Sequence, residues 1–277
     1  MITNPDNQPL TDEALLAQKK PRILTLANQK GGVGKTTTTI NLGAALAEQS
    51  YNVLIVDLDP QGNASTGLGV DEPDRLYTSY ELLLDRNSLR ADKICATSVE
   101  NVSIMPATSD LASADMELLA SEKRSTLLRQ TFLDASAVLS VYDYILIDCP
   151  PSLSLLTINA LVSAHSVLVP LQAEFFALEG LSQLLTTVKE VRKGANPALR
   201  IEGVVLTMFD ARNNLAQQVE EDARLNLGDL VFQTKIPRNV RLSEAPSFAI
   251  PVLTYDTNSR GAEAYRSLTQ EIMKNNV

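Results

Sequence analysis

The sequence predicts an α/β fold with a predominantly parallel, twisted sheet and helices on both of its faces. Apolar runs of strand length alternate with stretches of helical periodicity along the chain, and this alternation is typical of parallel strands joined by helical crossovers. A glycine-rich stretch also lies between the first apolar run and the first helical stretch. Folds of this kind bind phosphate groups at that place.

The composition is that of a globular protein with a large aliphatic core. The chain has 277 residues, of which 44% are hydrophobic and 5% are aromatic, and it has no Trp. We therefore expect a core of Leu, Val, Ile and Ala, which suits a parallel sheet. Since no linker divides the chain, we expect a flexible extension over residues 1–21 and a single domain over residues 22–277.

Cysteine usage, terminal sequence and charge limit the class of protein. Cys95 and Cys149 have no metal-ligand spacing, so we expect a reduced, cytoplasmic protein. Neither a signal-peptide core nor an apolar run of about 18 residues occurs, so we expect neither export nor a membrane span. The net charge is −9, but residues 186–277 hold 12 basic and 11 acidic residues. If a surface contacts nucleic acid, it should lie in this C-terminal third.

The glycine-rich stretch has the features of a phosphate-binding loop. It spans residues 29–37, follows the apolar run of residues 23–27 and precedes a helix that should begin near Lys35. Glycine lets successive backbone N–H groups point into one concavity, and the helix adds its positive end. We expect Lys35 to contact the β- and γ-phosphates and the Thr36 hydroxyl to bind the bridging Mg²⁺.

A second lysine makes this loop unusual. The ordinary phosphate-loop pattern has Gly where this chain has Gln29, and Lys30 follows it. Phosphate charge would explain two cations so close together, although a solvated loop lysine is the simpler reading of Lys30 alone. The predicted nucleotide-binding residues of the loop are Lys30, Gly31, Gly32, Val33, Gly34, Lys35, Thr36 and Thr37.

Two apolar strands end in carboxylates. Residues 52–56 precede Asp57 and Asp59, and an apolar run over residues 142–147 precedes Asp148. Ligands of open α/β sheets bind at the carboxyl ends of the strands. We therefore expect Asp148 to hold Mg²⁺ through water, Asp59 to orient the attacking water, and Asp57 to support the metal side of the site.

Other patterns predict structure rather than chemistry. Thr78 and Glu81 have the spacing of a capping box that opens a helix. The single histidine, His165, and Cys149 have no partners that indicate a metal site or a nucleophile. The remaining expected elements are helices at residues 41–48, 123–138 and 178–193, strands at residues 102–106, 165–170 and 201–207, and a C-terminal docking helix with Tyr265, Leu268 and Ile272. In the second helix, Leu127, Leu128, Phe132, Leu133 and Val138 are expected to pack in the core.

Three of these motifs together resemble a known family. Residues 30–37, residues 56–63 with the sequence Val-Asp-Leu-Asp-Pro-Gln-Gly-Asn, and residues 148–151 with the sequence Asp-Cys-Pro-Pro are similar to those of the deviant-Walker P-loop NTPases. Within that class the chain resembles the ParA/Soj chromosome- and plasmid-partition ATPases from about Arg22 to its C-terminus. The resemblance implies an ATPase that uses ATP and Mg²⁺.

The resemblance also implies roles for individual residues. Lys30, Lys35 and Asp59 would be the catalytic residues, with Lys30 crossing a two-fold interface to touch the partner subunit's nucleotide. The loop at residues 150–151 would be a switch that senses the γ-phosphate. ATP would then favour a homodimer, and hydrolysis would release it.

A C-terminal motif adds the adenine and DNA contacts. Residues 237–245 have the sequence Pro-Arg-Asn-Val-Arg-Leu-Ser-Glu-Ala, which is similar to the family's motif. The resemblance implies that Pro237 and Arg238 border the adenine, and that Arg241 contributes to non-specific binding of double-stranded DNA. Arg212, expected at the start of the preceding helix, resembles another DNA-contacting arginine. Lys235, in the same basic stretch, completes the predicted DNA-binding residues.

The sequence therefore predicts an ATP-dependent DNA-segregation ATPase in the cytoplasm, associated with the nucleoid. Its ATP-bound dimer would bind DNA non-specifically, and a ParB-like centromere-binding protein would stimulate hydrolysis.

Several alternative functions are compared with this prediction. A ParA-like ATPase that positions a protein cargo is an alternative that the sequence leaves open. A MinD-like membrane-cycling ATPase is an alternative, but residues 270–277 are too short and too weakly basic for an amphipathic anchor. A metabolic enzyme would need a substrate pocket or cluster cysteines. A DNA-binding protein without turnover would not need Asp59, Asp148 and both lysines.

Overall fold

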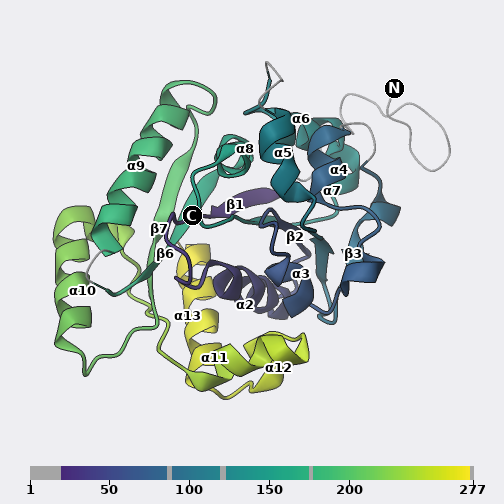
Figure 1. The fold of residues 1–277 in the computed structure, drawn as a ribbon. Coiled ribbons are helices and arrows are strands. Elements are labelled where there is room, and N and C mark those ends of the chain that lie inside the picture. The colour runs from purple at the N-terminus through teal and green to yellow at the C-terminus, as the bar shows by residue number, and fades with distance from the viewer. Residues whose placement is uncertain (1–19, 86–88, 119–122, 175–176, 275–277) are drawn as a thin grey trace.

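The computed structural model describes residues 20–85, 89–118, 123–174 and 177–274. The extension predicted over residues 1–21 lies almost wholly outside the described residues, so the predicted division of the chain stays a prediction. The rest contains a seven-stranded sheet in the order β3-β4-β2-β5-β1-β6-β7 (Figure 1). Every strand pair is parallel except β3 with β4. The predicted α/β fold with a predominantly parallel sheet is thus confirmed.

The predicted strands lie within two residues of the observed ones at each end. The strands are β1 (Arg22–Leu26), β2 (Val53–Asp57), β3 (Cys95–Ala96), β4 (Val102–Met105), β5 (Tyr144–Asp148), β6 (Ser166–Gln172) and β7 (Arg200–Thr207). The edge strand β3 was not predicted, because two residues are too few to form a periodic pattern.

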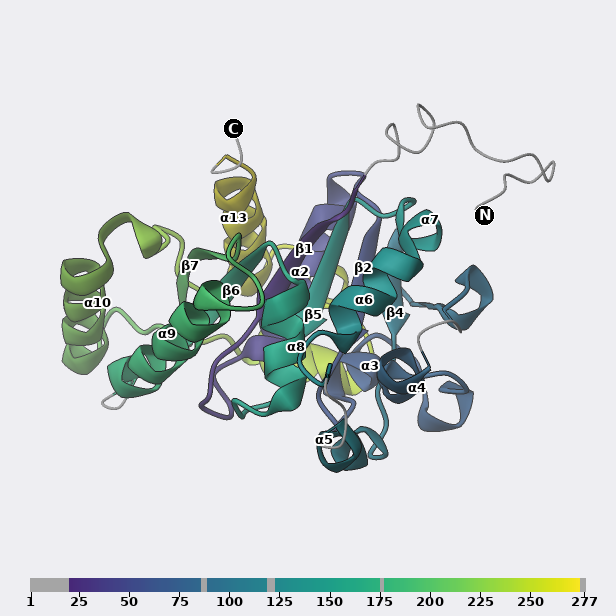
Figure 2. The same ribbon diagram turned by 90° about the horizontal axis from the view of Figure 1, so that it is seen from above.

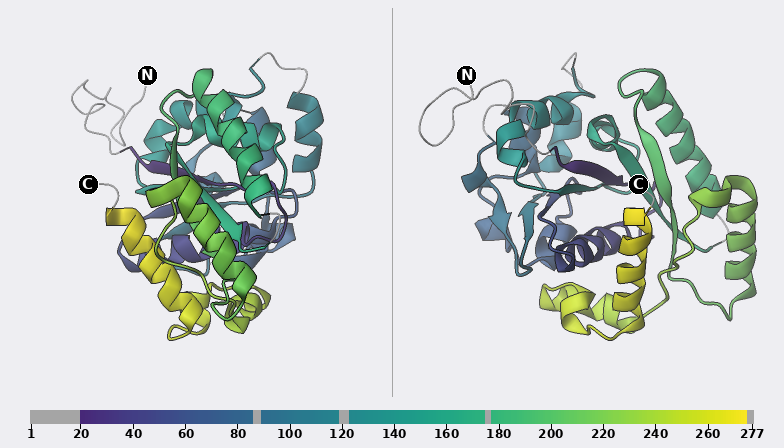
Figure 3. Two further views of the ribbon diagram at one scale, coloured as in Figure 1. Left: turned by 90° about the vertical axis from the view of Figure 1, so that its left-hand side faces the viewer. Right: turned by 180° about the vertical axis from the view of Figure 1, so that it is seen from behind.

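Helices cover both faces of the sheet. They are α2 (Lys35–Glu48), α3 (Asn63–Gly67), α4 (Ser79–Leu84), α5 (Leu111–Leu118), α6 (Leu127–Asp134), α7 (Ser136–Leu139), α8 (Leu155–Ser163), α9 (Ala177–Lys193), α10 (Asn214–Leu227), α11 (Val240–Glu244), α12 (Val252–Tyr255) and α13 (Arg260–Lys274). One face carries α2, α12 and α13, and the other carries α4 to α8 (Figure 1). Along the sheet, α9 and α10 lie at the β7 end, whereas α4 and α5 lie toward β4 (Figures 2 and 3).

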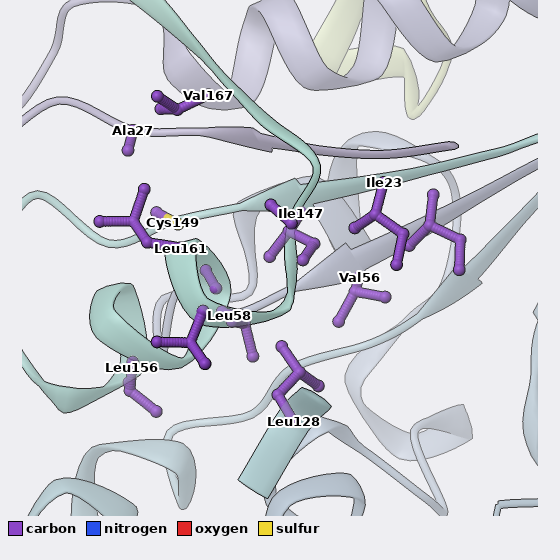
Figure 4. Packing of buried hydrophobic residues seen from close by; sticks show 14 of the residues in the cluster. Ile23, Ala27, Val56, Leu58, Leu128, Ile147, Cys149, Leu156, Leu161 and Val167 are labelled. Carbon is purple, nitrogen blue, oxygen red and sulfur yellow. The ribbon is translucent and has the colours of Figure 1, made fainter. Parts of the chain in front are cut away.

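Alternate residues of the central strands enter two separate cores. In β5, Ile145 and Ile147 belong to one cluster, and Tyr144 and Leu146 belong to the other. Such strands read as continuous apolar runs because both of their faces are buried. Cys149, at the end of β5, is fully buried in the first cluster (Figure 4), as predicted for a packing residue. Burial also raises the pKa of its thiol.

One predicted helix is broken. The helix expected over residues 123–138 is divided into α6 and α7 at Ala135. Phe132 is buried as predicted, but Leu133 is 59% exposed, so its prediction as a packing residue was wrong. Consecutive residues on a helix point about 100° apart, and Phe132 takes the core-facing position of this turn. Leu127 and Leu128 are buried as predicted, and Val138 is partly buried.

Two further helix predictions are confirmed, the capping box at residue 78 and the C-terminal docking helix. Thr78 and Glu81 form the capping box that opens α4. On α13, Tyr265, Leu268 and Ile272 are all buried, and the helix packs against α2 (Figure 1). Among the helices described, none is long and apolar enough to cross a membrane.

Candidate active site

The carboxyl ends of five neighbouring strands bring the predicted site residues to one edge of the sheet. Asp57 at the end of β2 is in register with Asp148 at the end of β5. Asp148 is in turn in register with Leu26, the last residue of β1, and the glycine-rich loop follows β1. Thr207 ends β7 beside Gln172 of β6. The site therefore lies where open α/β sheets bind ligands.

The loop between β1 and α2 has the backbone of a phosphate-binding loop. Gly32 and Gly34 have φ angles of 74° and 84°, a region that is strained for residues with a Cβ atom. Gly34 is the N-cap of α2, and no side chain caps this end of the helix. The first backbone N–H groups of α2 are thus available to an anion, and the helix dipole favours one there.

Side chains from β6 and β7 anchor the loop, and sequence reasoning missed them. The Asn28 amide donates to the Pro170 carbonyl (2.7 Å), and its oxygen accepts from the Lys30 N–H (3.0 Å). The Thr207 hydroxyl donates to the Val33 carbonyl (2.8 Å). Both side chains are buried. The only sequence signal for Thr207 was its position at the end of a predicted strand on the ligand side of the sheet.

Lys30 forms an ion pair within its own chain. Its Nζ donates to Glu174 Oε2 over 2.6 Å, and the two side chains are 38% and 44% exposed. Gln172 donates to the other oxygen of Glu174. Lys30 is therefore held toward the end of β6. Its predicted contact with a partner subunit's nucleotide stays a prediction.

Lys35 is buried next to the carboxylates of the site. It is 6% exposed, and its Nζ donates to the Lys30 carbonyl over 3.0 Å. Burial lowers the pKa of Lys35, and the negative charge of Asp148 is the largest opposing cause. An ammonium group with one carbonyl partner at a helix N-terminus is well placed to contact a phosphate.

Asp148 joins the loop helix to the end of β5. Its Oδ2 accepts from the Thr36 hydroxyl (2.6 Å), and its Oδ1 accepts from the Thr39 hydroxyl (3.0 Å). Burial, and secondly the charge of Asp57, raises the pKa of Asp148 to about 7. Two fully buried carboxylates beside a threonine hydroxyl are oxygen ligands that suit a hydrated Mg²⁺, whose charge would offset the cost of burying them. The residues present thus fit the predicted metal, and the assignment of Thr36 as its direct ligand stays a prediction.

Asp57 and Asp59 have different surroundings. Asp57 is fully buried, and its two oxygens accept from the Asp59 N–H (3.1 Å), the Ser65 N–H (3.0 Å) and the Ser65 hydroxyl (2.8 Å). Burial raises its pKa to about 6. Among the described residues, the Asp59 carboxylate accepts only from the Gln61 N–H, over 3.0 Å. Asp57 therefore fixes the loop that carries Asp59, and its predicted support of the metal stays a prediction.

A cavity of about 620 Å³ opens beside the loop helix. Gly34, Thr37 and Thr207 line it, and so do Pro237 and Arg238. Its other lining residues are mainly apolar, and they include Met208, Ile236, Val240 and Leu242. A planar base would fit between such walls. The structure therefore brings both residues predicted to border the adenine next to the phosphate loop.

A second cavity, of about 610 Å³, contains two of the three cationic residues predicted to bind DNA, Arg212 and Lys235. Arg212, Lys235, Arg238 and Arg260 line it, and it shares Pro237 and Arg238 with the first cavity. Of these cations, the sequence had not indicated Arg260. Arg212 lies in the turn before α10 rather than at the start of the helix, since α10 begins at Asn214.

The predicted DNA-binding residues all carry ion pairs. Arg212 is 91% exposed and pairs with Asp210 (2.8 Å), and Lys235 pairs with Glu220 (2.8 Å). Arg241 does not line the second cavity but lies on α11, where it pairs with Glu244 at 2.9 Å and with Asp256 at 3.2 Å. The structure thus brings Arg212 and Lys235 together and leaves Arg241 on a neighbouring surface.

Sequence comparison decides the family. A family model described as an AAA domain matches residues 21–201. The chain is 53% identical over 254 residues to the sporulation initiation inhibitor protein Soj of Bacillus subtilis, covering 92% of this chain and 99% of that protein. It is 51% identical over 252 residues to the chromosome partitioning protein ParA of Caulobacter vibrioides, covering 91% of this chain and 94% of that protein. The chain belongs to the ParA/Soj family of chromosome-partitioning ATPases.

Solved structures with nucleotides have the same fold. A cobyrinic acid a,c-diamide synthase from Mycobacterium smegmatis with a bound ATP analog and magnesium superposes with a TM-score of 0.77 at 36% identity, covering 92% of this chain and 95% of that chain. The septum site-determining protein MinD of Pyrococcus horikoshii, complexed with Mg-ADP, gives 0.71 at 28% identity, covering 92% and 97%. This ParA/Soj family member is therefore a DNA-segregation ATPase that uses ATP and Mg²⁺.

Proposed function

We propose that this ATPase binds double-stranded DNA non-specifically as an ATP-bound homodimer, and that hydrolysis releases it. The observation that supports the proposal is that two cavities have lining residues in common. Pro237 and Arg238 line both the cavity beside the phosphate loop and the basic cavity that contains Arg212 and Lys235. A nucleotide in the first cavity would therefore contact the same residues that shape the second.

The phosphate loop supplies the nucleotide chemistry. Residues 30–37 bind the triphosphate, and Lys35 contacts its β- and γ-phosphates. Thr36 would hold Mg²⁺ directly and Asp148 would hold it through water, and the ion would neutralise phosphate charge. Asp59 orients the attacking water, while Asp57 keeps the loop of Asp59 in place. Phosphoryl transfer depends on positioning and electrostatics more than on a strong base, so one carboxylate is sufficient.

Lys30 gives the dimer its dependence on ATP. Its ion pair with Glu174 is partly exposed, and exposed pairs contribute little stability. Lys30 can therefore leave Glu174 and reach the nucleotide of a second subunit. Since only ATP has a γ-phosphate, ATP and ADP would differ in the contacts they make across the interface, and this difference would shift the equilibrium between monomer and dimer.

The basic surface supplies the DNA contacts. Arg212, Lys235 and Arg241 would bind backbone phosphates, which carry no sequence information. A dimer presents this surface twice, so its DNA affinity should exceed that of the monomer. In the cell we place the protein in the cytoplasm on the nucleoid, and we assign stimulation of hydrolysis to a ParB-like centromere-binding protein.

Two other functions have less support. On α13, Tyr265, Leu268 and Ile272 are buried in the described structure, so they do not form the exposed apolar face that membrane cycling of the MinD kind requires. The diamide synthase is 36% identical, whereas Soj is 53% identical over nearly its whole length. Synthase chemistry is therefore the weaker assignment.

DNA retention tests the proposal. We expect the hydrolysis-deficient variant Asp59→Ala to co-sediment with DNA of unrelated sequences when ATP is bound, and not with ADP. Raising the salt concentration should weaken retention steeply, because phosphate contacts release counterions. Equal retention with ATP and ADP, or retention of one DNA sequence alone, would refute the proposed function.

A further inference from the structure

Arg75 lies against the segment that follows Asp59, and its guanidinium group donates hydrogen bonds to three residues. Its Nη2 donates to the Thr66 hydroxyl (2.8 Å) and to the Val70 carbonyl (2.9 Å), and its Nε also donates to Val70 (3.1 Å). Its Nη1 donates to the Ala107 carbonyl (2.9 Å). One guanidinium thus connects α3, the residues after α3 and the residues after β4.

The kind of acceptor separates Arg75 from the surface arginines. All four of these hydrogen bonds go to neutral oxygens, and among the described residues Arg75 has no ion pair. Arg90, by contrast, is 67% exposed and pairs with Asp92. A guanidinium presents its donors in a fixed planar fork. Arg75 is therefore placed to fix the relative positions of three backbone segments.

The guanidinium also touches the turn that contains Asp59. The Gly62 N–H donates to the Asp59 carbonyl over 2.9 Å. A Cβ atom on Gly62 would lie 2.4 Å from Nη1 of Arg75 and 2.9 Å from the Ala107 oxygen. Gly62 also has a φ of 60°. The turn thus lies directly against Arg75, with no room for a side chain between them.

A second connection reaches Asp59 through Asp57. The Ser65 hydroxyl accepts from the Ala107 N–H (3.0 Å) and donates to Asp57 (2.8 Å), and Asp57 accepts from the Asp59 N–H. Because Arg75 binds the carbonyl of Ala107 while Ser65 binds its N–H, the network closes around the segment from Asp59 to α3. The hydrogen bonds of this network have ordinary lengths.

We propose that Arg75 is a positioning residue for ATP hydrolysis. It holds the turn and α3 so that the Asp59 carboxylate stays where it orients the attacking water. The inference rests on the role of Asp59 in the proposed function. It assigns Arg75 to the hydrolysis step and not to nucleotide binding, because none of its bonds reaches the phosphate loop.

Single-turnover hydrolysis tests the inference. For Arg75→Ala we expect the rate to fall roughly 10- to 100-fold, as for other misplacements of about 1 Å at a reacting group. The dissociation constant for ATP should stay unchanged. Thr66→Val removes one acceptor on an exposed side chain, so it should fold normally and slow hydrolysis by about 2- to 10-fold, the value of one hydrogen bond. Arg90→Ala is the matched control and should behave as wild type.

Chemical rescue separates positioning from a loss of stability. Added guanidinium ion should restore part of the rate of Arg75→Ala and none of the rate of Asp59→Ala. Arg75→Lys should stay slow, since an ammonium cannot make the fork. Wild-type rates in both Arg75→Ala and Thr66→Val would overturn the inference, as would equal losses of rate and ATP affinity without rescue. Should Asp59→Ala itself hydrolyse ATP at the wild-type rate, the assignment of Asp59 in the proposed function fails first.

Discussion

The phosphate loop and the basic surface of the C-terminal third are held in place in different ways. In the loop, Asn28, Lys30 and Val33 bond to the ends of β6 and β7, more than 100 residues away in sequence. On the basic surface, Arg212 pairs with Asp210, two residues away, and the half-exposed Arg241 pairs with Glu244 and Asp256, three and 15 residues away. The fold thus prepares the loop before a ligand binds, whereas the arginines can exchange a neighbouring carboxylate for a phosphate.

If the loop is preformed, the largest effect should come from removing its buried cation. Lys35→Ala should weaken ATP binding by about 100-fold or more, because a charge-assisted contact in a buried site is lost. Titration calorimetry with ATP and Mg²⁺ measures this effect. Lys189→Ala, which removes an exposed lysine of α9, is the control. Equal affinities of the two variants would show that Lys35 does not bind the phosphates.

The anchor from β7 should have the next largest effect. Thr207→Val keeps the shape of the side chain but leaves the Val33 carbonyl without its partner, which should cost about 1–2 kcal/mol, or roughly 5- to 30-fold in ATP affinity. Thr207→Ser should restore binding. Thr186→Val is the control, since Thr186 is exposed and its hydroxyl donates within α9. An unchanged ATP affinity in Thr207→Val would contradict the view that β7 fixes the loop.

The basic surface should respond differently. Arg212→Glu should weaken DNA binding at every sequence and reduce the salt slope of log K by about one phosphate contact or more. It should leave ATP-dependent dimerisation intact. Arg192→Glu makes the same charge change on an exposed residue of α9 and is the control. Fluorescence anisotropy with DNA at several salt concentrations measures the salt slope of each variant. Equal salt slopes for Arg212→Glu and Arg192→Glu would show that Arg212 does not contact DNA.

Glu174→Gln should have the smallest effect. It removes the carboxylate that pairs with Lys30 and should shift the ATP-dependent dimerisation constant toward the dimer by up to about 5-fold, the range of a partly exposed ion pair. Analytical ultracentrifugation across protein concentrations measures the constant. Glu179→Gln, a change on α9, is the control. A weaker dimer in Glu174→Gln would mean that Glu174 supports Lys30 at the interface instead of competing for it.

The sequence signals that predict the nucleotide site are local. Gly32 and Gly34 mark backbone angles that other residues avoid, and Asp148 follows a recognisable apolar strand. The parallel sheet, and the place of the site at the carboxyl ends of its strands, could likewise be expected from the alternation of strands and helices, but the order of the strands could not.

Contacts between distant segments could not be predicted in this way. Nothing near Thr207 or Arg75 in the sequence reveals that one binds the phosphate loop and the other binds α3 and the end of β4. The break of the predicted helix at Ala135 was likewise not visible, because helical periodicity alone predicts continuity there. These segments become neighbours only when the strands pair into the sheet, so their contacts are visible in the structure and not in the sequence.

The molar mass of Asp59→Ala with bound nucleotide tests the central claim most directly. Light scattering should give twice the subunit mass with ATP and the subunit mass with ADP. Adding Lys30→Ala should give the subunit mass with both nucleotides, while adding Lys189→Ala should leave the ATP-bound dimer intact. The same mass with ATP and ADP, or an ATP-bound dimer without Lys30, would contradict the account.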